Sequence, residues 1–102
     1  MTIIGATIFS NTAADDGGGL FVNGGDVLLE ESTLQGNVAL QSGGAVRTVA
    51  GTLSVVRSLV ISNVVLGASA TGGGIDNRGA ATVAESTFQS NQAWRGAAIH
   101  QS

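Results

Sequence analysis

Apolar side chains recur along this chain in short alternating runs that return about every 26 residues. An apolar residue, two variable residues and an asparagine occur together four times, with the asparagines 26, 26 and 28 residues apart. These asparagines are Asn11, Asn37, Asn63 and Asn91. Short alternating runs are typical of half-buried strands, and no stretch shows a strong helical period. The pattern therefore predicts one strand-and-turn unit repeated along the chain.

Other positions keep the same register as the asparagines. Two residues before each apolar anchor stand Ala6, Ser32, Ser58 and Ser86, and three residues earlier stand Ile3, Leu29, Val55 and Val83. Two residues after each asparagine stand Ala13, Ala39, Val65 and Ala93. A glycine-rich corner follows in every unit, at 17–20, 43–46, 72–75 and 96–99. Chance would not align so many columns, so the chain is an internal repeat.

A period near 26 residues suits a coil of three short strands joined by turns. In such a solenoid each strand pairs with its equivalent in the next coil, about 4.8 Å away, and equivalent residues stack into ladders. We therefore expect an all-β fold, a right-handed parallel β-helix of the pectate-lyase-like kind. It would have about three to four coils and form a single domain over residues 1–102.

The four asparagines and the serines Ser32, Ser58 and Ser86 form the structural ladder of this prediction. Asparagine suits a turn that needs left-handed backbone geometry, and its amide can bond the amide of the next coil. The glycine pairs suit sharp corners that cannot accommodate a Cβ atom.

A leucine-rich repeat is the rival fold, because residues 29–37 echo its pattern and the period is in range. A serine, however, replaces the middle leucine of that pattern. Each unit also continues into glycine corners and a second alternating stretch such as 20–22. These features favour the β-helix.

Composition narrows the function classes. Charged residues make up only 11% of the chain and hydrophobic residues 43%, which excludes a disordered polar tail. A net charge of -3 without a basic run argues against nucleic-acid binding. There is no cysteine, so disulfides and thiol metal sites are absent. No run reaches the roughly 18 apolar residues of a membrane span, and a secretion signal would lie outside this chain.

The corner Gly-Gly-Ala-Val at 43–46 and the Phe-x-x-Asn at 88–91 resemble the repeats of chlamydial polymorphic outer membrane proteins. They also resemble related β-helix repeats of other bacterial surface proteins, and the resemblance covers essentially the whole chain. It is degenerate, since only one anchor is phenylalanine and the last corner is Gly-Ala-Ala. The resemblance implies an extracellular or outer-membrane-associated passenger or stalk domain, often adhesive. It carries no catalytic residues to transfer.

Two columns carry charge. Glu31, Arg57 and Glu85 would stack in the favourable order negative, positive, negative, either as a surface ladder or as a substrate strip. Phe21, Arg47, Asp76 and His100 form the second column. There Phe21 can meet Arg47 through a cation–π contact, and Arg47 and His100 can both flank Asp76. An outward structural ladder is the favoured interpretation, and a histidine–aspartate acid–base pair is the alternative.

A third column, three residues after each asparagine, is Ala14, Leu40, Leu66 and Trp94. Alternation turns it away from the buried column that contains Ala39, so it would form an exposed stripe for a partner. A second packed corner, or cover by a longer loop, is the alternative.

Two further features offer little chemistry. The loop at 67–71 belongs to the longest connection between an asparagine and the next corner, and it is small and uncharged. Asp15 and Asp16 provide two carboxylates toward a calcium site, but a solvated turn explains them better. We expect no cofactor and no metal.

Two functions remain. The first is a structural or binding scaffold segment of a bacterial surface or secreted protein, with further coils, a self-stacking partner, a glycan or a host protein as partner. The second is a polysaccharide lyase or glycoside hydrolase on the same fold. That enzyme would need clustered carboxylates, which the positions of Asp15, Asp16, Asp26, Asp76 and Glu85 do not guarantee. Because the chain starts partway through one coil and stops after a corner, we expect a fragment of a longer solenoid.

Overall fold

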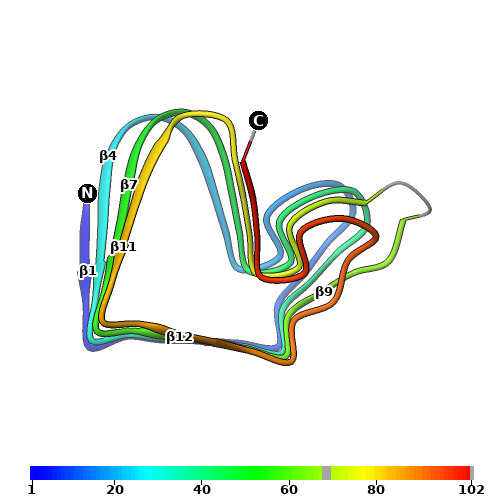
Figure 1. The fold of residues 1–102 in the computed structure, drawn as a ribbon, viewed down its shortest axis with the longest axis horizontal. Coiled ribbons are helices and arrows are strands. Elements are labelled where there is room, and N and C mark those ends of the chain that lie inside the picture. Colours follow the sequence, from blue (N-terminus) through cyan, green and yellow to red (C-terminus); the bar gives the residue numbers. More distant parts are fainter. Residues whose placement is uncertain (68–69, 102) are drawn as a thin grey trace.

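The chain winds into a parallel β-solenoid of about four turns (Figure 1). The computed structural model describes residues 1–67 and 70–101. Its shortest extent, 20 Å, lies along the view of Figure 1 and fits four strands spaced about 4.8 Å apart. In that view the chain runs anticlockwise and the later turns lie nearer to the viewer, so the path is right-handed.

Three parallel sheets form the walls. The first contains β1 (Thr2–Ile4), β4 (Leu20–Glu30), β7 (Val46–Val56), β10 (Ile75–Asn77) and β13 (Ile99–Gln101), and β11 (Ala80–Ala84) also pairs with β7. The second contains β2 (Thr7–Phe9), β5 (Thr33–Gln35), β8 (Leu59–Ile61) and β12 (Thr87–Gln89). The third contains β3 (Thr12–Ala13), β6 (Val38–Ala39) and β9 (Val64–Val65).

Strand register follows the repeat columns of the sequence. Ile3 is paired with Leu29, Leu29 with Val55, and Val55 with Val83, each in the next turn. The all-β solenoid prediction is confirmed. The leucine-rich alternative is wrong, because the described residues contain no helix for its convex side.

Inward-facing apolar columns fill the space between the first two sheets. Leu29 and Val55 in one column, and Leu34 and Val60 in another, are fully buried. Burying such side chains stabilises the fold by roughly 1.5–3 kcal/mol each. In the first coil the equivalents Ile3 and Ile8 are only partly buried.

The left-handed corner residue lies one position earlier than we expected. Positive φ angles occur at Ser10, Gly36, Ser62 and Ser90, each immediately before a ladder asparagine. A second set, Gly5, Glu31, Arg57 and Glu85, precedes the alanine and serines of the other ladder. At both corners the left-handed residue turns the chain, and the side chain that follows forms the ladder.

A second, smaller lobe extends from the main coil where β9 is labelled (Figure 1). It contains the third sheet and the segments that lead from it back to the first sheet. Isolated parallel bridges join Asp16 to Ser42 and Ser42 to Thr71 there, so the lobe repeats from coil to coil. Of the longer loop at 67–71, residues 68 and 69 lie outside the described residues. Its neighbour Ala70 is buried, and its N–H donates to Gly67 O at 3.2 Å.

Candidate functional site

The asparagine ladder is a continuous chain of buried amide bonds. In Asn37 the backbone N–H and the Nδ2 group both donate to Oδ1 of Asn63, at 3.0 and 2.9 Å. Asn63 bonds Asn91 in the same way, and Asn11 bonds Asn37. Each Nδ2 also reaches back to a carbonyl of the preceding coil, as from Asn63 to Leu34 O at 3.0 Å. The ladder therefore satisfies the corner amides inside the fold.

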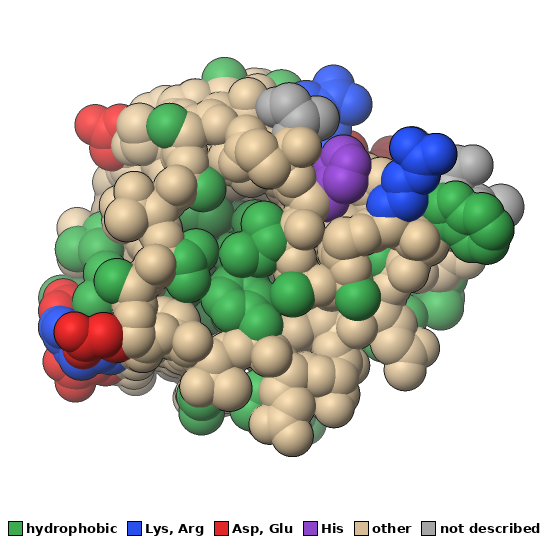
Figure 2. All heavy atoms as spheres, viewed as in Figure 1, with side chains coloured by type: hydrophobic (Ala, Val, Ile, Leu, Met, Phe, Trp, Pro, Cys, Tyr) green, Lys and Arg blue, Asp and Glu red, His purple; other side chains and the backbone are tan. Residues whose placement is uncertain are grey.

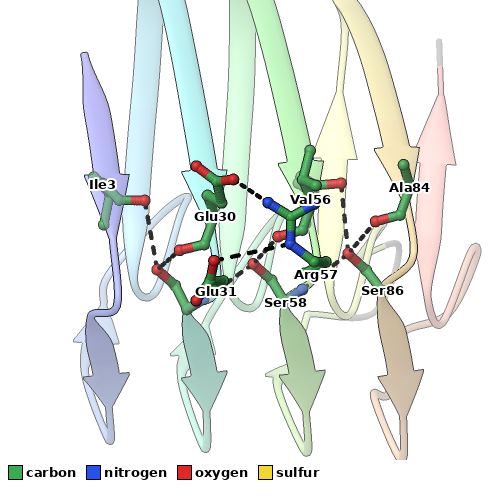
Figure 3. A network of polar contacts seen from close by, with 10 residues as sticks. Ile3, Glu30, Glu31, Val56, Arg57, Ser58, Ala84 and Ser86 are labelled. Carbon is green, nitrogen blue, oxygen red and sulfur yellow. Dashed lines mark hydrogen bonds and ion pairs between the residues drawn. The ribbon is translucent and has the colours of Figure 1, made fainter.

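A serine ladder does the same at the other corner (Figure 3). The N–H of Ser32 donates to Oγ of Ser58, and the N–H of Ser58 donates to Oγ of Ser86, both at 3.1 Å. Each hydroxyl donates in turn to the carbonyl two residues before it, as Ser58 Oγ does to Val56 O at 2.9 Å. In the first coil Ala6 donates to Ser32 Oγ and offers no hydroxyl of its own. Both ladders have a structural role.

The surface ladder around Arg57 differs from the expected order. Arg57 pairs most closely with Glu30, and its Nε lies 3.9 Å from Oε1 of Glu31 (Figure 3). Glu85 occupies the equivalent corner one coil later, but it joins no ion pair among the described residues. Because the Arg57 side chain is about half exposed, this cluster contributes about 0–1 kcal/mol per pair.

The second charged column forms a compact polar cluster. Register pairs Phe21 with Arg47, Arg47 with Asp76, and Asp76 with His100. One carboxylate oxygen of Asp76 forms an ion pair with Arg47 NH1, and the other lies 2.8 Å from Nδ1 of His100. Asp16 joins from the smaller lobe, with its Oδ2 3.8 Å from Arg47 Nε.

We expected this column on the surface, and that expectation is wrong for its two central residues. Arg47 is 5% exposed and Asp76 is 1% exposed. Their side chains point out of the main core, as alternation predicts, but the smaller lobe folds back over them and supplies Asp16. Phe21, in the first coil, remains exposed.

The electrostatics of the cluster favour a structural role. Burial lowers the pKa of Arg47, the nearby charge of Arg78 adds to this, and Asp16 opposes it. A buried guanidinium needs a carboxylate partner, and Asp76 provides one. Both oxygens of Asp76 are engaged, so it has no free oxygen to offer a substrate.

The remaining acidic residues do not gather. Asp15 accepts a hydrogen bond from Gln41 Nε2 at 3.1 Å, whereas its neighbour Asp16 faces Arg47. Asp26 accepts from Thr52 Oγ1 at 2.6 Å, in the first sheet. Within residues 1–67 and 70–101, no three histidine or acidic side chains lie close enough to hold a metal ion.

The third column forms the outer stripe, which we define as Ala14, Leu40, Leu66 and Trp94. Leu40 is 43% exposed, Leu66 is 64% exposed and Trp94 is 72% exposed. The column beside it points inward, with Ala39 and Val65 buried. The described residues do not cover this stripe as a packed corner would.

Comparison with protein-family models, with curated proteins and with solved structures found no match to this chain. In the part of the chain that the structure describes, no helix is long and apolar enough to cross a membrane. Function is therefore argued below from the motifs and the side-chain columns.

Proposed function

We propose that this chain is a structural and binding scaffold segment of a bacterial cell-surface or secreted protein, of the adhesin or autotransporter-passenger type. The corner and anchor motifs support this proposal through their resemblance to repeats of polymorphic outer membrane proteins. The observation that carries it is the outer stripe, a column of large apolar side chains held on a hydrogen-bonded ladder.

The outer stripe has the properties of a docking surface. Its members repeat at the coil spacing of about 4.8 Å, so Leu40, Leu66 and Trp94 form one apolar strip along the solenoid. The buried ladders behind it fix its backbone, which lowers the ordering cost of binding. Tryptophan is among the residues that contribute most to protein interfaces. We therefore favour a protein on a host surface as the partner, rather than a glycan.

The stripe is tested by two serine substitutions and one matched control. Leu66→Ser and Trp94→Ser are expected to weaken binding of the labelled chain to intact cultured animal cells by tenfold or more. Leu59→Ser provides the control, because Leu59 is a similarly exposed leucine on the second sheet. Protease treatment of the cells should abolish binding if the partner is a protein, and glycosidase treatment should abolish it if the partner is a glycan. Equal binding by all three variants would exclude the stripe.

A polysaccharide lyase or glycoside hydrolase on the same fold is the alternative. Its best candidates, Asp76 and Arg47, are buried and paired with each other, which argues against exposed acid–base chemistry. A polyuronate-cleavage assay distinguishes the two proposals. Cleavage by the native chain that is lost in folded Asp76→Asn and Arg47→Met variants would replace the scaffold proposal.

A further inference from the structure

The two ends of the described solenoid expose the same apolar columns. Figure 2 shows the end formed by the last coil, where hydrophobic side chains gather in a hollow. Val83 and Ile99 are 38% and 37% exposed there, whereas Val55 and Ile75, one coil earlier in the same columns, are buried. At the opposite end Ile3, Ile8 and Leu20 are partly buried. In these columns the two end faces match each other.

The asparagine ladder gives the ends opposite polarity. Each asparagine donates its backbone N–H and Nδ2 to Oδ1 of the asparagine one coil later. In a head-to-tail stack of two copies, Asn91 of one copy would donate to Oδ1 of Asn11 of the second copy. Apolar columns and ladder polarity therefore both favour stacking of the chain on itself.

The glycine corner opposes this stacking. A Cβ atom on Gly18, Gly44 or Gly73 would lie 2.3, 2.1 or 2.4 Å from a backbone carbonyl oxygen of the next coil. None of these three glycines has a positive φ, so the close approach of the next coil is what requires glycine there. The fourth residue of this column is Ala97, which carries a real Cβ on the open face of the last coil. Its methyl group would strike the carbonyl of any coil stacked in the same geometry.

The neighbouring column shows that this restriction is specific. Its members are Gly19, Ala45, Gly74 and Ala98. Ala45 lies fully buried inside the stack, so this column accommodates a methyl group between two coils. Ala98 is therefore no obstacle, and it provides a matched control for Ala97.

The first coil carries a second mismatch. Ser58 and Ser86 accept the N–H of the serine one coil earlier, but Ala6 has no hydroxyl with which to do so. In a head-to-tail stack the N–H of Ser86 would face the methyl group of Ala6 of the second copy. A buried N–H without an acceptor is unfavourable. Both departures from the repeat thus fall on the same hypothetical contact.

We propose that Ala97 blocks head-to-tail stacking of this chain on itself, with Ala6 as a second and weaker mismatch. Open parallel edges template uncontrolled assembly, and a head-to-tail contact of this kind generates filaments. A methyl group at the corner prevents that outcome while the internal coils remain unchanged. Any coil that does pack on this face must follow a different path at corner 96–98. This inference does not depend on the ligand of the outer stripe.

Sedimentation velocity over a concentration series tests the proposal, with every variant in a Leu66→Ser background to remove contacts through the stripe. The background chain and its Ala98→Gly control are expected to be monomeric. Ala97→Gly is expected to form head-to-tail oligomers, and Ala6→Ser/Ala97→Gly should form them at lower concentration. Circular dichroism melts establish that each variant is folded.

Asn11→Ala shows whether the oligomers form as proposed, because it removes the acceptor that Asn91 of another copy would use. Added to Ala97→Gly, it should lower the oligomer fraction at least severalfold. The proposal is overturned if Ala97→Gly stays monomeric at its highest soluble concentration. It is also overturned if the oligomers ignore Asn11→Ala, or if the background chain assembles as readily as Ala97→Gly does.

Discussion

Asn63 Oδ1 accepts hydrogen bonds from both the backbone N–H and the side-chain amide of Asn37, a residue 26 positions earlier in the chain. Asn63 is fully buried, and its own amide bonds Leu34 O and Asn91 Oδ1. One side chain therefore connects three successive coils. Polar columns of this kind fix the register of the solenoid, because a slip of one residue would leave several buried groups without partners.

Replacing this asparagine tests how much the ladder contributes. Asn63→Leu should destabilise the fold by about 2–4 kcal/mol, because buried donors on Asn37 and the carbonyl of Leu34 lose their partner. The matched change Asn11→Leu, in the first coil, should cost less, since no earlier coil donates to that residue. Urea unfolding of both variants measures the difference. Similar costs at the two positions would show that the amide bonds between coils contribute little.

The glycine corner gives a steric prediction. Gly44→Ala should prevent native stacking, or cost more than about 4 kcal/mol, because its Cβ would lie 2.1 Å from Gly73 O. Gly5→Ala is the control: its φ is +62° but no atom lies within 4 Å of the added Cβ. That change should cost only about 1–2 kcal/mol of left-handed strain. Thermal melting distinguishes the two, and a mild effect of Gly44→Ala would contradict the close approach of the coils.

The two ion-pair sites should respond very differently to loss of charge. Asp76→Asn leaves Arg47 buried beside a neutral group and should destabilise by about 3–5 kcal/mol. Arg57→Gln removes a half-exposed cation from Glu30 and Glu31 and should cost less than about 1 kcal/mol. Restoration of stability in an Arg47→Met/Asp76→Leu double variant would show that pairing, rather than the charges themselves, is required at the buried site. Chemical denaturation of the four proteins checks this, and equal single-variant costs would contradict the burial of Asp76.

The repeat columns were predictable because their spacing alone determines what stacks on what. The column of Leu29 and Val55, and the pairing of Arg47 with Asp76, both follow from counting about 26 residues along the chain. A strand period of two also predicts that Arg47 and Asp76 point away from the main core.

What period alone could not provide is the path of the chain between columns. The burial of Arg47 depends on the smaller lobe folding back over the first sheet, and no alternating pattern specifies that return. Asp16 was considered only as a possible calcium ligand, although an acidic residue before a glycine corner was the available signal. The left-handed corners show a similar limit, because Glu31, Arg57 and Glu85 adopt positive φ without a residue type that announces it.

The proposed role of the chain is tested most directly by where it is found in the cell. Cells of the source organism would be fractionated and probed by immunoblot with an antibody raised against this segment. A surface scaffold predicts a band in the cell envelope or in the medium. A band confined to the soluble cytoplasmic fraction would contradict the proposal.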